Sequence, residues 1–298
     1  AGPGGPGYYL HDPQTLASRV ARMVDTLEHY PMADGVVMDG PEWGYEMAPH
    51  HMDHRSYFFN DLPESVAPMA KDLGYDYAAM VAAKDRLLAL FHDLDPKRIR
   101  SNARGGLVGA HRMLGADGDL MAWLSFRVDS LTRYFRGVRE GVAAHLDRPV
   151  RMGCGPRSAA FAPLCGYDFV DLAEFMDFLL PKHYFFHRGF DGFVGTVYRY
   201  AQTLTEWNPG LAVADALEVV QALFGISLPG VGDDMLDFES ALSPEFFEQV
   251  VTQETRRAIA AVDDPERIVP WLDTGRFPHD GDPMSARDLK MLLDAADA

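Results

Sequence analysis

Hydrophobic and polar residues alternate along the chain with two different periods, which predict its helices and strands. Within residues 14–30, the apolar positions that recur at helical spacing are Leu16, Val20, Met23, Val24 and Leu27. Asp12 followed by Pro13 is typical of an N-cap and a first helical residue. Residues 34–40, DGVVMDG, form a short apolar run between turn residues, as in a strand buried on both faces. We therefore expect a helix that leads into a buried strand.

The same alternation repeats further along the chain. We predict strands at 121–127, 149–155, 177–186 and 267–275, and helices at 129–147, 168–176 and 285–298. Strands that alternate with helices indicate parallel βαβ units. Two mostly helical segments, about 60–115 and 193–262, interrupt this order without a linker or a change in composition. We interpret them as loop insertions in a single domain that spans residues 1–298.

Composition narrows the classes of partner. The chain has 298 residues, is 47% hydrophobic and carries a formal net charge of −17. An acidic surface repels phosphate, which argues against nucleic acid as a partner, and no apolar run is long enough to predict a membrane span.

We expect Cys154 and Cys165 to be free buried thiols, with a single disulfide in a secreted chain as the alternative. No signal peptide is visible, so we expect a soluble protein and leave its compartment open.

Polar residues follow the predicted strands repeatedly. They are Asp39 and Glu42, Arg127 and Asp129, Arg157, Lys182 with His183 and Tyr184, and Asp273 with Arg276. Because the carboxyl ends of parallel strands face one edge, we expect most of these side chains to converge on a cleft. An alternative for Asp129 is an N-cap of the following helix.

The stretch GVVMDGPEWGYE, residues 35–46, contains the strongest candidates for acid/base chemistry. Glycoside hydrolysis needs one protonated and one ionised carboxyl group. We assign the ionised role to Asp39, next to a cation, and the general-acid role to Glu42, next to Trp43 and Tyr45. The two aromatic rings would also supply a platform for a sugar. In the alternative interpretation, Asp39 orients a structural cation and Trp43 belongs to the core.

Asp273 follows the last predicted strand and is the third catalytic candidate, with a cap or an ion pair to Arg276 as the alternative. The residues expected to bind substrate are Trp43, Tyr45, Arg127, Arg157, Lys182, His183 and Tyr184.

The histidine cluster HHMDHR, residues 50–55, contains three residues that could bind a metal ion, His50, Asp53 and His54. It lacks the HExxH pattern and any CxxC pair, so an exposed polar loop or sugar-hydroxyl contacts are the favoured interpretation. We expect no metal and no cofactor. The chain also lacks a GK[ST] phosphate loop and a GxSxG elbow.

Three motifs resemble a family of uncharacterised bacterial glycoside-hydrolase-like TIM barrels. DGVVMDGPEWGYE resembles the fourth strand of that family, GYDFVDLAEFMDFLLPKHYFF its sixth helix and seventh strand, and RIVPWLDTGR its eighth strand. The resemblance implies a partial (β/α)8 barrel that contains about strands four to eight and is truncated at its N-terminus. It also implies a glycosidase. One departure is that Pro181–Tyr184, at the end of the seventh strand, contains no carboxylate, where retaining glycosidases keep a nucleophilic glutamate.

The predicted function is therefore hydrolysis of a glycosidic bond in a carbohydrate or other small polar substrate. The alternatives are a metal-dependent sugar isomerase or lyase with Lys182 as its acid/base, and a barrel that binds carbohydrate without catalysis.

Overall fold

The computed structural model describes residues 10–50, 52, 57–60, 62–230, 244–275 and 284–297. The first half contains α1 (Pro13–His29), β1 (Gly35–Met38), α2 (Tyr57–Asn60), η2 (Glu64–Val66), α3 (Ala67–Asp72), α4 (Tyr77–Phe91), α5 (Pro96–Asn102), α6 (Gly106–Leu114) and α7 (Gly118–His145). The second half contains β2 (Arg151–Cys154), α8 (Ala162–Cys165), α9 (Phe169–Ala173), β3 (Phe178–Leu179), β4 (Lys182–His183), α10 (Phe193–Trp207) and α11 (Val213–Phe224). It continues with α13 (Pro244–Phe246), the π-helix η3 (Phe247–Thr252), α14 (Gln253–Val262), η4 (Pro265–Arg267), β5 (Trp271–Leu272) and α15 (Ala286–Ala296).

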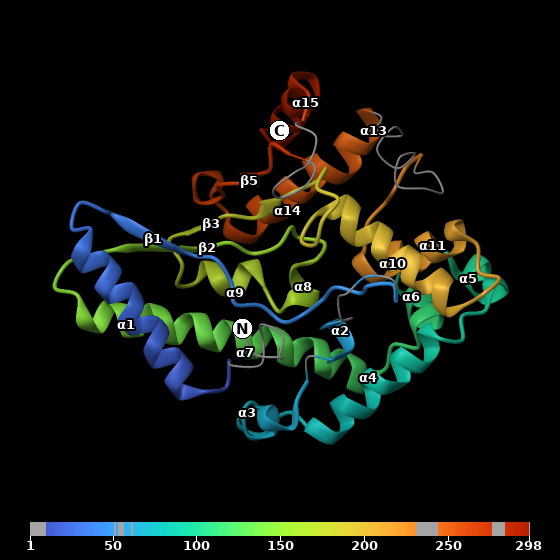
Figure 1. Cartoon of the computed structure of the whole chain (residues 1–298), viewed down its shortest axis with the longest axis horizontal. Helices are drawn as coiled ribbons and strands as arrows, with labels where there is room; N and C mark the ends of the chain where they lie inside the picture. The colour runs from blue at the N-terminus through green and yellow to red at the C-terminus, as the bar shows by residue number, and fades with distance from the viewer. Residues whose placement is uncertain are drawn as a thin grey trace.

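The strands form two small parallel sheets, β1-β2-β3 and β4-β5. Two backbone hydrogen bonds connect them: Lys182 N to Pro156 O at 2.9 Å and Val269 N to Leu179 O at 2.9 Å. Four chain segments therefore lie side by side with the same direction. In Figure 1 these strands lie between α1 and α7 on one side and α14 and α15 on the other.

The predicted (β/α)8 barrel is wrong. The fold is mostly helical, and its short parallel sheets do not close into an eight-stranded barrel within the described residues. The strand pairing that the sequence predicts is parallel, as observed, but each strand is only two to four residues long. Strands this short leave most of the core to helices.

The predicted strand at 121–127 is also wrong, because these residues lie inside the long helix α7. The sequence MAWLSFR contains no β-branched residue, and Met, Ala, Leu and Arg are good helix formers. The helix begins earlier than expected, at a cap where Asp117 accepts a hydrogen bond from the Leu120 amide at 2.8 Å. Asp129 is consequently an interior helix residue rather than an N-cap.

Prolines shorten the later strands. The predicted strand 177–186 is divided into β3 and β4 around Pro181, which has no amide hydrogen to donate to a ladder. Within the predicted strand 267–275, the strand β5 is limited to Trp271 and Leu272, directly after Pro270, and Ile268 makes a single parallel bridge to Leu179. The predicted helix near residues 14–30, with its Asp12 cap, and the strands within 34–40 and 149–155 are confirmed.

Helix α7 and an irregular segment, residues 41–48, form the centre of the core. Trp43 and Met47 of the segment are fully buried, as are Phe126, Leu131 and Phe135 of α7. Figure 1 shows the chain after β1 running through the middle of the molecule, above α7.

Both cysteines are free and buried, as predicted. Burial raises the pKa of the Cys154 and Cys165 thiols, so both remain protonated and unreactive at neutral pH. Among the described helices, none has the length and apolar character needed to cross a membrane.

Gly166 is where α8 meets this core, and its replacement tests the packing. Its φ is +89°, and an added Cβ would lie 2.5 Å from the Arg127 carbonyl oxygen and 2.7 Å from Trp43 Cδ1. Gly74 has a similar φ of +85° but open space around it. Each alanine substitution should cost ~1–2 kcal/mol of left-handed strain, and Gly166→Ala should cost about 1–3 kcal/mol more from overpacking. Urea unfolding of both variants measures the difference; equal losses would contradict this packing.

Candidate functional site

The ends of the four parallel segments bring together charged side chains, beginning with Asp39 and Lys182. Asp39 directly follows β1, and Lys182 is the first residue of β4. Lys182 Nζ lies 2.5 Å from Asp39 Oδ1; the lysine side chain is 7% exposed and that of the aspartate 58%. A buried ammonium therefore orients a carboxylate that is open to solvent.

Arg157 connects two further carboxylates beside this pair. Its Nε donates to Glu42 Oε2 at 2.8 Å, and its Nη2 donates to Glu42 Oε1. The same Nη2 lies 2.8 Å from Asp191 Oδ1. Glu42 is almost buried, whereas Asp191 is about half exposed. Glu42 is thus held on both oxygens by one guanidinium, and Asp191 presents the accessible carboxylate.

Asp273 and His187 form the opposite edge of the cluster. Asp273 follows β5, and its Oδ2 lies 3.7 Å from His187 Nε2. The imidazole is buried and the carboxylate is about one quarter exposed. This separation allows an electrostatic contact but is too long for a direct hydrogen bond.

Tyr184 lies within the field of these groups. Burial is the main cause that raises the pKa of its phenol to about 12, and the charges of Asp39, Asp273 and Asp191 add to it against the opposing charge of Arg157. Tyr184 directly follows β4, and the segment that contains β3 and β4 lies between β2 and β5, which places Tyr184 between the two edges. It remains protonated at neutral pH and can donate a hydrogen bond.

His183 is buried in β4, and neither of its ring nitrogens has a hydrogen-bond partner among the described residues. Burial lowers the pKa of its imidazole to about 4. His183 is therefore neutral at physiological pH. Its position in the core does not bring it to the exposed edge where Asp39 lies.

Of the ten residues that the sequence nominates, six meet at this edge. They are Asp39, Glu42, Arg157, Lys182, Tyr184 and Asp273. His183 is adjacent but enclosed, and the other three, Trp43, Tyr45 and Arg127, lie in the core at 2% exposure or less. Substrate binding by these three stays a prediction that the geometry does not favour, because no ring face of Trp43 or Tyr45 is open to a ligand.

The buried aromatic residues and Arg127 have structural contacts. The Trp43 indole donates to Ser130 Oγ at 3.0 Å, and Arg127 Nη2 donates to the Gly44 carbonyl. The guanidinium also lies over the rings of Trp43, Phe58 and Trp123. Asp129 accepts a hydrogen bond from the Tyr75 hydroxyl at 2.5 Å instead of joining the cluster.

The histidine stretch is only partly described. His50 is exposed; its amide donates to Glu206, and its Nε2 lies 3.6 Å from Glu206 Oε1. Asp53, His54 and Arg276 lie outside the described residues. Within the described part of the chain, no group of three His, Cys, Asp or Glu side chains has a geometry that could hold a metal ion.

Sequence reasoning missed three residues of this region: Glu46, His187 and Asp191. Glu46 Oε1 accepts from the Asp191 amide at 3.1 Å, from Thr196 Oγ1 at 2.6 Å and from Arg199 Nη2 at 2.8 Å. Asp191 has φ of +76°, which is uncommon for a residue with a side chain. The Asp191-Gly192 pair is a turn signal in the sequence, and it is the one sign that could have drawn attention to this loop.

No protein-family model matches the chain, and neither a curated protein nor a solved structure matches it significantly.

The buried His183 should make stability depend on pH. Its unfolded pKa is about 6.5 and its folded pKa about 4, so the unfolded state binds a proton first as the pH falls. The stabilisation is complete above the unfolded value and is lost as the pH falls through this window, by about 2 kcal/mol between pH 7 and pH 5. In His183→Leu, the decrease in unfolding free energy over that interval should be smaller by this amount. The exposed His145→Leu serves as control, and identical pH slopes in both variants would refute the assignment.

Proposed function

We propose that this protein hydrolyses a glycosidic bond with Asp39 and Asp273 as its two working carboxylates. The observation that supports this proposal is that both are accessible to solvent and follow the two outer segments, β1 and β5, of the four parallel segments, while Tyr184 follows a segment that lies between them. Glycoside hydrolysis requires two carboxyl groups on opposite sides of the scissile bond.

Asp39 is assigned the ionised role. The Lys182 ammonium lies 2.5 Å from its Oδ1 and orients the carboxylate, while more than half of the Asp39 side chain stays open to a ligand or a water molecule. Such a carboxylate can activate water as a general base.

The proton donor is assigned to Asp273, whose carboxyl group exchanges a proton with the leaving-group oxygen. The buried imidazole of His187 lies 3.7 Å from its Oδ2, too far for a direct hydrogen bond, and is assigned a positioning role. Tyr184 lies between the two edges as a neutral hydrogen-bond donor for a sugar hydroxyl.

The order of the segments supports inversion of configuration. Three strand spacings of about 4.8 Å separate residue 39 from residue 273, about 14 Å at the backbone. For inversion, the two side chains would have to shorten this to the roughly 6.5–9.5 Å between carboxyl groups that inverting enzymes use to admit water. Retaining enzymes need about 5–5.5 Å.

Glu42 is assigned a supporting role in place of the general-acid role expected from the sequence. Both of its oxygens accept hydrogen bonds from Arg157, and its side chain is nearly inaccessible. A carboxylate in this position orients Arg157, which in turn contacts Asp191.

Kinetics on a panel of aryl glycosides tests these roles. Asp273→Asn should lower kcat more for poor leaving groups than for activated ones, because activated leaving groups need little protonation. Asp39→Asn should lower kcat by roughly 10²–10⁴-fold for all of them, since water activation is lost. The exposed Asp25→Asn, on α1, is the matched control and should leave the rate unchanged.

Equal losses for all leaving groups in Asp273→Asn would refute the acid role, and unchanged rates in both variants would refute the proposed site. Sugar binding without turnover in the unmodified protein would favour the non-catalytic alternative. Activity that appears only with added divalent cations would favour the isomerase or lyase alternative.

A further inference from the structure

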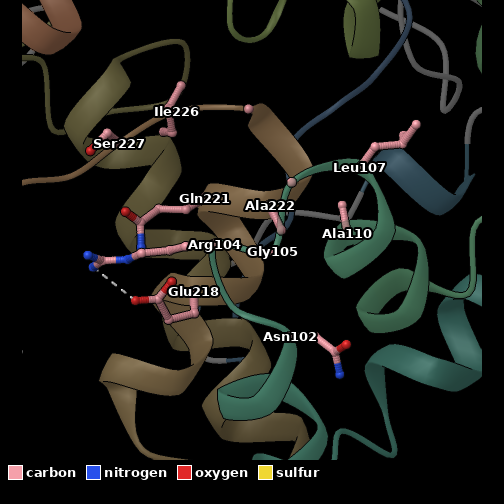
Figure 2. A pocket seen from close by; sticks show the side chains of 12 residues that line it. Asn102, Arg104, Gly105, Leu107, Ala110, Glu218, Gln221, Ala222, Ile226 and Ser227 are labelled. Carbon is pink, nitrogen blue, oxygen red and sulfur yellow. Dashed lines mark hydrogen bonds and ion pairs between the residues drawn. The ribbon is translucent and has the colours of Figure 1, made fainter.

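A hollow of about 440 Å³ lies between α6 and α11. None of the residues that line it belongs to the proposed site. Its walls include Arg104, Leu107 and Ala110 on one side and Glu218, Ala222 and Ile226 on the other. Figure 2 shows Arg104 reaching toward Glu218 of α11, while Leu107 points away from that pair. We call this hollow and its rim on α5 and α6 the α5–α6 groove.

The rim of the α5–α6 groove is basic, although the chain is strongly acidic. The protein has 44 Asp and Glu residues, yet residues 96–113 contain none and contain five Lys and Arg residues. All five cations, Lys97, Arg98, Arg100, Arg104 and Arg112, are exposed. A local reversal of charge in a chain of net charge −17 gives this surface an electrostatic preference of its own.

Three of these cations are available to a partner. Arg100 pairs with Asp215 and Arg104 with Glu218, both on α11. Lys97, Arg98 and Arg112 have no carboxylate partner within the part of the chain that the structure describes. Arg98 Nε donates to the Arg112 backbone carbonyl at 2.6 Å, so the Arg98 side chain lies against the last turn of α6.

The groove also exposes apolar side chains next to this charge. Leu107 is 86% exposed and Val108 is 59% exposed, both in the first turn of α6. Neighbouring apolar residues in an exposed patch are typical of interaction surfaces.

The loop that presents Leu107 is tightly constrained. Arg104 and Gly106 have φ of +56° and +60°. A Cβ on Gly105 or Gly109 would lie 2.8 or 2.3 Å from the Asn102 carbonyl oxygen, so the backbone can take this path only with glycine there. Left-handed geometry at a non-glycine residue such as Arg104 is costly and is found preferentially at functional positions. The surface is thus formed before a partner arrives.

We infer that the α5–α6 groove binds an acidic, amphipathic segment of a partner protein, whose apolar side chains enter the hollow between α6 and α11 and whose carboxylates meet Lys97, Arg98 and Arg112. Charge complementarity identifies the acidic character, and the hollow with its exposed Leu107 identifies the apolar anchors. A concave surface fits a helix or an extended segment better than a flat membrane. The exposed apolar side chains of Leu107 and Val108 favour a protein segment over a nucleic acid, whose phosphate backbone offers no matching apolar group.

Binding is tested with the full chain and a fluorescent synthetic peptide that has Leu and Phe at helical i, i+3, i+4 spacing and Asp and Glu between them. We expect a micromolar Kd that weakens about tenfold from low to high salt, since rim charges are screened. Two control peptides, one with Lys in place of the acids and one with Ser in place of the apolar residues, should each bind at least tenfold more weakly.

Matched variants locate the binding. Lys97→Gln with Arg112→Gln should weaken binding about tenfold, while Arg22→Gln with Lys71→Gln removes the same charges elsewhere and should not. Leu107→Ser should weaken it several-fold, whereas Met32→Ser, at an equally exposed 87% position, should not. All six positions changed in these four variants are exposed, so circular dichroism should show unchanged folding.

Three results would overturn the inference. The first is no saturable binding of the acidic peptide, and the second is equal weakening by the matched control variants. The third is that the protein binds vesicles of phosphatidylserine and phosphatidylcholine, or a single-stranded oligonucleotide, more tightly than it binds the peptide. Each readout is independent of glycosidase activity.

Discussion

The segment from Pro41 to Glu46 crosses the interior without a partner strand, and the rest of the structure is arranged to satisfy its polar groups. Buried backbone groups need hydrogen-bond partners, and a segment outside a helix or sheet must find them elsewhere. Four carbonyls of the segment accept hydrogen bonds: Pro41 from the Tyr167 hydroxyl, Gly44 from Arg127, Tyr45 from the Tyr200 hydroxyl and Glu46 from the Phe58 amide. The Trp43 amide donates to the Cys165 carbonyl. Four separate parts of the chain, around residues 58, 127, 165–167 and 200, thus converge on six residues.

Buried arginines are the main cost of this arrangement. Arg127, Arg157 and Arg199 are each at most 4% exposed, and removing a charge from water is expensive unless it is paired. Arg157 pairs with Glu42 and Arg199 with Glu46, while Arg127 lies against three aromatic rings and a carbonyl. The two glutamates of the GPEWGYE motif therefore compensate two of the three arginines, and the motif has a structural purpose whatever its chemistry.

The need to pair buried polar groups with distant residues explains which parts of the fold could be predicted from the sequence. Helix α1, its Asp12 cap and strands β1 and β2 follow from local periodicity, and the sequence indicates them correctly. The pairing of Asp39 with Lys182, 143 positions later, also agrees with the expectation that strand ends of one direction meet. Trp43 and Tyr45 could not be placed this way, because an aromatic residue after a strand can line a cleft or fill a core, and only contacts with distant helices decide. Apolar residues 121–127 were similarly ambiguous over a short window, and the length of α7 became apparent only with its capping residue Asp117.

The scaffold and the proposed site share one residue, Arg157. It holds Glu42, at the start of the buried segment, and contacts Asp191, whose amide is held in turn by Glu46 near the end of the same segment. A displacement of residues 42–46 would therefore move Arg157 and the Asp191 loop together, beside Asp39 and Tyr184. Polar groups at the strand ends can stay fixed on strands of only two to four residues because a buried network, rather than a long sheet, sets their positions. In this fold the precision of the site comes from ion pairs and hydrogen bonds in the core, which is the role that extended strand ladders have in larger parallel sheets.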